Sequence, residues 1–268
     1  MKDFRLDDLA AYLAIAIALL TAVTIFVFSL PALPYISLGA MRDPVSKVFG
    51  LAAYVFGTFY VSLFAISLAA PIGILTALYL GRYAHERIRR YYSMIIEAMA
   101  SIPSVVYGLR GLLVLGSFMT IRANKLVASI TLSLMLLPTI ISLSRAAIES
   151  VPIELKEAAY ALGAMDHEVA LLSLSYLRPK LIGAVLIAFM RAVGETMAVT
   201  MTIGNVARIS LNPLDPGSTL TSLIATEFGG AMDPIHRSAI LFAAFVLIVI
   251  STSIYALARR VIRHAEGV

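Results

Sequence analysis

Two residues of opposite charge stand inside a long apolar stretch of the sequence. Arg191 and Glu195 lie four residues apart in the segment 181–203. A charged side chain at the centre of a bilayer costs about 2.5–3.5 kcal/mol on insertion scales, so such residues normally face a polar cavity or a partner. The planar guanidinium of arginine can bind an oxyanion through two parallel hydrogen bonds. Because residues i and i+4 share a helix face, we expect Arg191 and Glu195 to line a path for an anion, with Glu195 orienting Arg191.

Hydroxyl side chains accompany these charges. Ser101 and Ser104 flank Pro103, which can kink a helix and free a backbone carbonyl, and Thr196 directly follows the glutamate. These hydroxyls are candidates for lining a polar route, but serine and threonine also bond back to carbonyls of their own helix. The charged pair has a structural alternative as well, namely a salt bridge that locks two helices together.

The elements that must position these residues are membrane-spanning helices. Hydrophobic residues make up 60% of the 268 residues, charged residues make up 14%, and the mean hydropathy is +0.91. A spanning helix needs about 20 mostly apolar residues. We therefore expect an all-α membrane protein, a single permease-like domain over residues 1–268 with a bundle of six transmembrane helices. The six candidate spans are 9–30, 54–80, 95–118, 126–148, 181–203 and 237–259.

Several activities are disfavoured by what the sequence lacks. It contains no cysteine, and its four histidines are scattered, so we expect no thiol chemistry and no metal site. The nucleotide-binding motif G-x-x-x-x-G-K-[ST] and the zinc-protease motif H-E-x-x-H are both absent. No basic stripe with interleaved aromatic residues indicates a nucleic-acid partner, and the net charge of +5 favours anionic membrane lipid instead. We expect no catalytic residues and no cofactor bound by this chain.

The positions of lysine and arginine predict the orientation in the membrane. Positively charged loops are retained on the cytoplasmic side. One set of loops and ends holds thirteen basic residues: Lys2, Arg5, Arg82, Arg87, Arg89, Arg90, Arg145, Lys156, Arg178, Lys180, Arg259, Arg260 and Arg263. The other set holds six: Arg42, Lys47, Arg122, Lys125, Arg208 and Arg237. We expect a multi-pass protein of the cytoplasmic (inner) membrane with both termini in the cytoplasm.

The loop 145–180, between the fourth and fifth spans, is then cytoplasmic, and its residues predict two short helices. Pro152 suits the first turn of a helix, where Glu154 complements the positive end of the helix dipole. Gly163 is placed to end this helix. Asp166 is placed to cap a second one.

One face of the first short helix offers small side chains to a partner. Leu155, Ala158, Ala159 and Leu162 share a face at helical spacing. The alternative is an amphipathic connector that lies on the membrane surface.

Glu157, Ala158 and Ala159, followed by Gly163, resemble the EAA loop of ABC importer permeases. In that family this loop forms a coupling helix that docks on the ATPase subunit. Three longer segments resemble the phosphate-specific permeases, closest to the PstC type, and the similarity covers about residues 54–260. The segments are IPSVVYGLRGLLVL (Ile102 to Leu115), RAVGETMAVTMTIGN (Arg191 to Asn205) and LTSLIATEFGGA (Leu220 to Ala231).

The chain also departs from the family pattern at two places. The family's loop usually closes with a Leu-Pro pair, whereas here Leu174 precedes Ser175 and the proline comes at Pro179. Arg110 stands where the family usually has an aromatic residue. We expect a differently bent loop exit and an extra positive charge beside the substrate path.

The resemblance implies import of inorganic phosphate, driven by ATP hydrolysis in partner subunits. The implied partners are a sister permease of the PstA type in a heterodimer, two ATP-binding subunits and an extracytoplasmic phosphate-binding protein. Glu195 could accept a hydrogen bond from protonated phosphate. Two alternatives remain: the same architecture importing another oxyanion such as sulfate or molybdate, and an ion-coupled secondary transporter or intramembrane scaffold without an ATPase.

Overall fold

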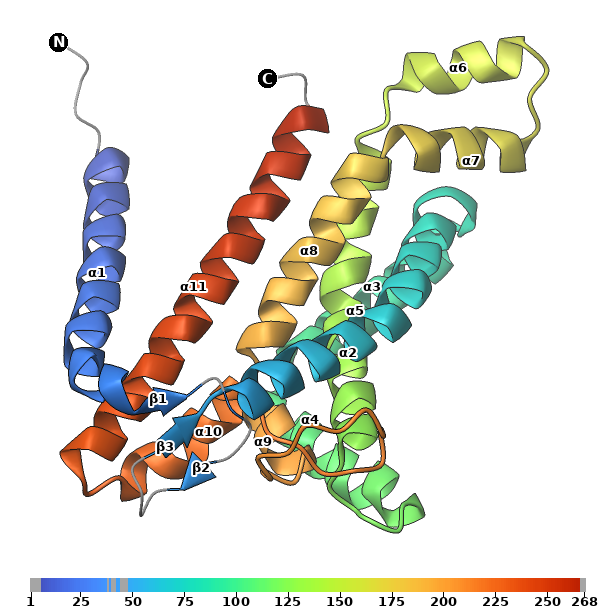
Figure 1. The fold of residues 1–268 in the computed structure, drawn as a ribbon. Coiled ribbons are helices and arrows are strands. Elements are labelled where there is room, and N and C mark those ends of the chain that lie inside the picture. Colours follow the sequence, from blue (N-terminus) through green and yellow to red (C-terminus); the bar gives the residue numbers. More distant parts are fainter. Residues whose placement is uncertain (1–5, 38, 40–41, 44–47, 266–268) are drawn as a thin grey trace, which may run out of the picture.

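The computed structural model describes residues 6–37, 39, 42–43 and 48–265, and helices dominate it (Figure 1). The helices are α1 (Leu6–Ser29), α2 (Ala52–Leu78), α3 (Glu86–Ser101), α4 (Ser104–Arg110), α5 (Lys125–Glu149), α6 (Ile153–Ala161), α7 (Asp166–Tyr176), α8 (Arg178–Gly194), α9 (Met197–Thr202), α10 (Leu220–Glu227) and α11 (Pro234–Ala265). Shorter 3-10 or π-helical turns are η1 (Leu30–Tyr35), η2 (Tyr79–Tyr83), η3 (Gly111–Leu115), η4 (Gly116–Phe118) and η5 (Phe228–Gly230). The expected all-α class is confirmed.

The described structure is compatible with the expected bundle of six transmembrane helices only if bent helices are counted as spans. In the described part of the chain, four helical stretches are long and apolar enough to cross a membrane: Tyr12–Tyr35, Ala52–Tyr83, Lys125–Glu149 and Pro234–Arg263. The number rises to six if each of two bent helix pairs is counted as one span. Helix α3 and the segment that begins with α4 meet at 92°, and α7 and α8 meet at 63°. The candidate span over 95–118 is therefore sharply bent beside Pro103, the proline that was expected to kink it.

The centre of the bundle is the contact between α2 and α5. Helix α2 carries small residues at every fourth position, which places them on one face: Ala65, Ala69, Gly73 and Ala77. A Cβ atom at Gly73 would lie 2.6 Å from Ile140 Cγ2 of α5, so this position has room for glycine alone. Small residues let helix backbones approach closely in a membrane, where apolar burial gives little drive for association.

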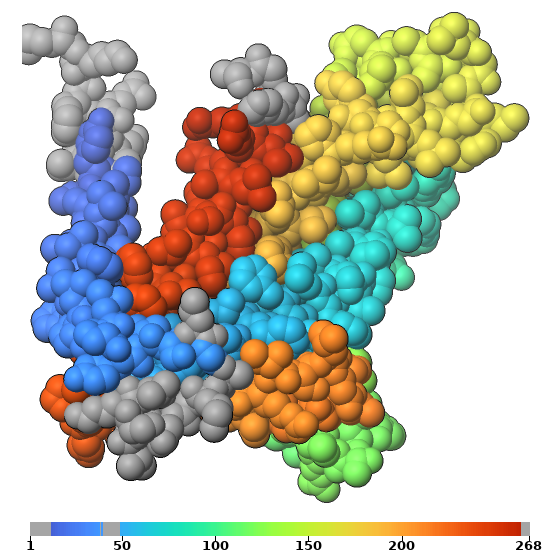
Figure 2. All heavy atoms as spheres, viewed as in Figure 1, coloured from blue at the N-terminus to red at the C-terminus, as the bar shows by residue number. Residues whose placement is uncertain are grey.

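Helix α1 is attached to the bundle along part of its length. Its ring contact with α11 joins Phe26 to Phe245, with centroids 4.8 Å apart. Only 6% of the apolar window of this span is buried inside the chain, and Figure 2 shows open space between the upper part of α1 and α11. A helix with this exposure is stable in lipid or against another apolar helix.

Figure 1 separates two ends of the bundle. The start of α1 and the end of α11 lie at the same end as α6 and α7. The opposite end holds α10 and a three-stranded sheet that the sequence did not suggest, built from β1 (Ile36–Ser37), β2 (Arg42–Asp43) and β3 (Val48–Gly50). Strand β3 pairs in parallel with β1 and antiparallel with β2. Of the basic residues used to predict orientation, Lys2, Arg5 and Lys47 lie outside the described residues.

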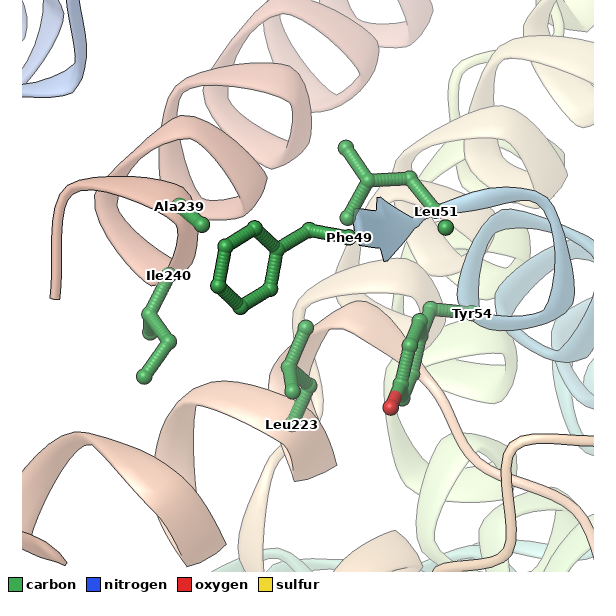
Figure 3. Close-up of a pocket in the computed structure, with 7 residues that line it drawn as sticks. Phe49, Leu51, Tyr54, Leu223, Ala239 and Ile240 are labelled. Atoms are coloured by element: carbon green, nitrogen blue, oxygen red, sulfur yellow. The ribbon is translucent and has the colours of Figure 1, made fainter. Parts of the chain in front are cut away.

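Below the sheet, β3, α2, α10 and α11 enclose a small apolar cavity (Figure 3). Phe49, Leu223 and Ile240 surround it, and its volume is only about 10 Å³. A cavity of this size and polarity is not a site for an ion, because a bound ion or water needs several polar partners. It marks the seam that joins the sheet to the helices.

The loop between α9 and α10 is folded around a buried lysine at the start of α5. Lys125 is fully buried; its Nζ donates to the carbonyl of Ser210 and lies 4.9 Å from the centroid of the Tyr60 ring. Within the loop, the Ser210 hydroxyl donates to Asp215 at 2.6 Å. This hydrogen bond and the charge of Arg208 hold the pKa of Asp215 below its ordinary value, against desolvation, which raises it. The loop is thus a fixed cap on the helix ends.

We expect Lys125→Met to loosen this cap. The substitution keeps the apolar stem of the side chain but removes a charged hydrogen-bond donor, an interaction worth about 1.5–3 kcal/mol. The melting temperature of the purified protein in detergent should therefore fall by several degrees. Lys156→Met on α6, whose side chain has no such set of contacts in the described structure, is the matched control. An unchanged melting temperature in Lys125→Met would show that the buried ammonium does not hold the loop.

Candidate functional site

The charged segment predicted as a single fifth span is broken in the middle. Helix α8 ends at Gly194, Glu195 is extended with φ −69° and ψ 125°, and α9 begins at Met197. The expectation of one helix over 181–203 was therefore wrong, and so was the expectation that Arg191 and Glu195 share a helix face. Irregular backbone at membrane depth is tolerated where it is covered by protein or lines a polar cavity.

Arg191 lies in the last turn of α8 and turns toward α5. Its guanidinium Nη1 donates to the hydroxyl of Thr139. Arg191 lies thirteen residues after the start of α8, which corresponds to about 20 Å along the helix at 1.5 Å per residue. The side chain is exposed, and in the described part of the chain no carboxylate forms a salt bridge with it. The carbonyl end of α8 favours a cation at this position.

Glu195 serves the backbone of the break and does not pair with Arg191. Its Oε1 accepts a hydrogen bond from the backbone N–H of Ala198 at 3.2 Å, which caps the first turn of α9. Its carbonyl accepts from the hydroxyl of Thr221 on α10 at 2.9 Å. The hydroxyl of Thr196 donates to the carbonyl of Gly194 at 3.3 Å. Neither the expected orienting contact nor the alternative salt bridge is present in this conformation.

The other predicted path residues lie around the bend between α3 and α4. The Ser101 hydroxyl donates to the carbonyl of Ala98 in its own helix, and Ser104 is the first residue of α4. Arg110, at the end of α4, lines a mostly apolar cavity of about 290 Å³ between these elements and α5. Thr131 of α5 also lines this cavity; its buried hydroxyl lies against Gly111 and, among the described residues, has no hydrogen-bond partner.

Helix α4 joins the two groups of predicted residues, because it packs directly on α9. Gly108 permits this approach, since a Cβ atom there would lie 2.9 Å from the Cα of Ala198. Tyr107 lines the cavity beside Arg110. Its hydroxyl donates to the carbonyl of Met99 on α3 at 2.9 Å.

Sequence reasoning missed Thr139 and Tyr107. Thr139 is one hydroxyl in a long apolar run, and Tyr107 is one of twelve tyrosines. Their only signal was proximity to features already noted: Thr139 follows a proline, and Tyr107 stands three residues before Arg110.

We expect Thr139→Val to impair transport of an anion that binds Arg191. Valine has the same shape but lacks the hydroxyl that fixes the guanidinium, and a hydrogen bond to a charged group is worth about 1.5–3 kcal/mol. The concentration of substrate at half-maximal uptake should rise about 10-fold at an unchanged protein level. Thr139→Ser, which retains the hydroxyl, should behave as the wild type. Equal behaviour of valine and serine variants would remove Thr139 from the site.

The polar loop contains the two predicted short helices, α6 and α7. Gly163 follows α6 with φ +85°, a conformation that favours glycine, and its N–H donates to the carbonyl of Tyr160 at 2.9 Å. Asp166 is the first residue of α7 rather than its cap. The preceding residue, Met165, occupies the cap position, and its N–H donates to Glu168 at 2.8 Å.

The predicted contact face of α6 is only partly accessible. Glu157, Ala158 and Leu162 are exposed, whereas Ala159 is buried and Leu155 half-buried. The expectation of one free face was therefore wrong, because the side that bears Ala159 is covered within this chain.

Three comparisons with known proteins match this architecture. The family model of the binding-protein-dependent transport system inner membrane component matches residues 69–266. The phosphate transport system permease protein PstC of Mesorhizobium japonicum is 34% identical over 251 residues, which cover 84% of this chain and 77% of the relative. The protein of the same name from Xylella fastidiosa strain 9a5c is 35% identical over 243 residues, covering 81% and 75%.

A solved structure shows the same fold. The structure described as an inward-facing conformation of the MetNI methionine ABC transporter aligns with a TM-score of 0.59 at 21% identity, covering 82% of this chain and 99% of that one. The family model spans most of the chain, and the two PstC proteins share about a third of its residues. This chain therefore belongs to the family of binding-protein-dependent transport system inner membrane components, as a multi-pass membrane protein.

Proposed function

We propose that this chain is the transmembrane permease subunit of an ATP-driven importer of inorganic phosphate. The observation that carries the proposal is Arg191, an exposed guanidinium in the last turn of α8, held by Thr139 and without a carboxylate partner among the described residues. Intramembrane ionisable residues of this kind mark substrate paths. The similarity to two phosphate permeases supports phosphate as the cargo.

Arg191 would bind the substrate as it passes the break between α8 and α9. Two parallel N–H groups match two phosphate oxygens. Glu195 uses Oε1 for the backbone of α9, and Oε2 would accept a hydrogen bond from the protonated oxygen of phosphate. Sulfate at neutral pH has no such proton, so this contact would favour phosphate. Tyr107 and Arg110 would line the neighbouring part of the route, and Ser101, Ser104 and Thr196 remain candidates for its polar lining.

The energy for transport would come from partner subunits. The proposed assembly contains a sister permease of the PstA type, two ATP-binding subunits and an extracytoplasmic phosphate-binding protein. Helix α6 would be the coupling helix: Glu157 and Ala158 are exposed for docking, Ala159 is buried against the rest of the chain, and Gly163 ends the helix with a positive φ. Both termini and the α6–α7 loop would then be cytoplasmic. The loop between α9 and α10, which packs around Lys125, would face the binding protein.

Uptake of radiolabelled phosphate into proteoliposomes tests the cargo. The vesicles contain the four-component complex and ATP inside, with sulfate or molybdate added outside as competitor. Phosphate uptake that excess sulfate and molybdate do not reduce supports the proposal. Uptake of sulfate or molybdate in place of phosphate would keep the architecture and reject the cargo. Membership of this family disfavours the hypothesis of an ion-coupled secondary transporter. Phosphate uptake without ATP would support that hypothesis instead.

A further inference from the structure

A polar cluster joins the inner end of α2 to the α6–α7 loop. Arg82, in the π-helical turn η2, donates from Nη2 to the hydroxyl of Tyr160 on α6 at 2.6 Å. That hydroxyl in turn donates to Oδ1 of Asp166, the first residue of α7, also at 2.6 Å. Arg82 and Asp166 lie 3.8 Å apart, and the guanidinium carbon lies 5.9 Å from the centroid of the Tyr160 ring. Three elements therefore share one tyrosine hydroxyl.

The cluster has a buried side and an exposed side. The side chain of Arg82 is 14% exposed and that of Asp166 is 76% exposed. The turn that carries Arg82 is anchored in the core, because Leu80 belongs to a buried cluster with residues of α5 and α8, including Ile148 and Leu181. Tyr160 and Asp166 stand outside that core.

The chain offers α6 and α7 few other polar contacts with α2. In the described structure, the remaining one is a long hydrogen bond of 3.5 Å from the Tyr83 hydroxyl to the carbonyl of Asp166. Exposed ion pairs of this kind add little to folding stability. In the described structure, the cluster is therefore the main polar connection between the end of α2 and the α6–α7 loop.

We propose that Arg82, Tyr160 and Asp166 form a link through which displacement of α6 and α7 is passed to the inner end of α2. The inference rests on the proposed function, since α6 is the element that a partner ATPase would push. Tyr160 lies one helical turn after Glu157, so movement of the docked helix reaches its hydroxyl directly. Because α2 packs on α5 through its stripe of small residues, rotation of its inner end reaches the helix that bears Thr139.

Tyr160→Phe tests the link, because it removes one oxygen atom and keeps the ring. Uptake and ATP hydrolysis are measured together in proteoliposomes with the complete complex. Phosphate transported per ATP hydrolysed should fall at least 5-fold. Tyr176→Phe is the matched control: it removes a hydroxyl from an exposed tyrosine of α7 for which the described structure gives no such contact, and its ratio should equal that of the wild type.

A distance measurement separates loss of the link from damage to folding. Because the chain has no cysteine, spin labels can be placed at Tyr79→Cys on η2 and Leu171→Cys on α7, with partner subunits made cysteine-free. With Tyr160 present, the label distance should change little between nucleotide-free and ATP-bound complexes; with Tyr160→Phe, it should change by several ångströms. If Tyr160→Phe transports phosphate with the wild-type ratio of phosphate to ATP and shows the wild-type label distances, the link is overturned, although the proposed function stands. Absence of ATP-dependent uptake in the wild type would instead reject the proposed function.

Discussion

Replacing Arg191 with alanine is expected to reduce phosphate uptake on the order of 100-fold, far more than it lowers the amount of protein in the membrane. Truncating one partner of a desolvated charge pair costs about 2–5 kcal/mol, and each 1.4 kcal/mol is tenfold in affinity. Here the truncated partner is Arg191, and the partner that loses its contact is the transported anion. Because Arg191 forms no salt bridge in the described structure, its removal leaves no carboxylate stranded in the bundle.

The matched variant is Arg191→Lys, which keeps the charge but loses the planar donors. Its uptake should lie between those of the wild type and the alanine variant, because lysine acts on an oxyanion as a point charge. Uptake is compared with immunoblot quantification of the membrane fraction. If uptake and protein level fall in equal proportion in Arg191→Ala, the arginine has a structural role and the substrate path lies elsewhere.

Changes in the middle of α6 and directly after it are expected to uncouple ATP hydrolysis from uptake. Gly163→Pro is incompatible with the backbone, because Gly163 has φ +85° and proline requires about −65°. It also removes the N–H that bonds to Tyr160. Glu157→Lys reverses an exposed charge at the proposed docking surface. Both variants should insert at normal levels, and phosphate transported per ATP should fall at least 10-fold.

Two neighbouring changes serve as controls for these variants. Gly163→Asn should retain coupling, since asparagine tolerates the left-handed conformation and a side chain here meets nothing within 4 Å. Glu154→Lys reverses another exposed charge on the same helix, outside the EAA-like segment. Normal uptake together with normal ATPase activity in both Gly163→Pro and Glu157→Lys would reject α6 as the coupling helix.

The sequence predicted those parts of the fold that follow from composition and from local backbone chemistry. Long apolar runs predicted the helical membrane class, and Pro152, Gly163 and the acidic residues between and after them predicted two short helices in the polar loop. Gly163 is in the left-handed conformation that its place after α6 predicted. These signals act within a few residues, so they can be read without knowledge of the tertiary contacts.

The site could be predicted only in part, because its geometry depends on contacts between distant segments. The sequence singled out Arg191 by the cost of burying charge, but an uninterrupted helix was assumed, and the break at Glu195 separates the pair. That break is stabilised by Thr221, 26 residues further on. The partner that Arg191 finds, Thr139, lies 52 residues away on α5. Helical spacing carries no information about either contact.

The dependence of phosphate uptake on ATP tests the central claim most directly. Proteoliposomes with the complete complex are filled with either ATP or ADP, and the initial rate of radiolabelled phosphate entry is measured with the phosphate-binding protein outside. The proposal predicts rapid entry with ATP, entry at the level of empty vesicles with ADP, and loss of the ATP-dependent component in Arg191→Ala. Equal rates with ATP and ADP, or an ATP-dependent rate unaffected by Arg191→Ala, would contradict it.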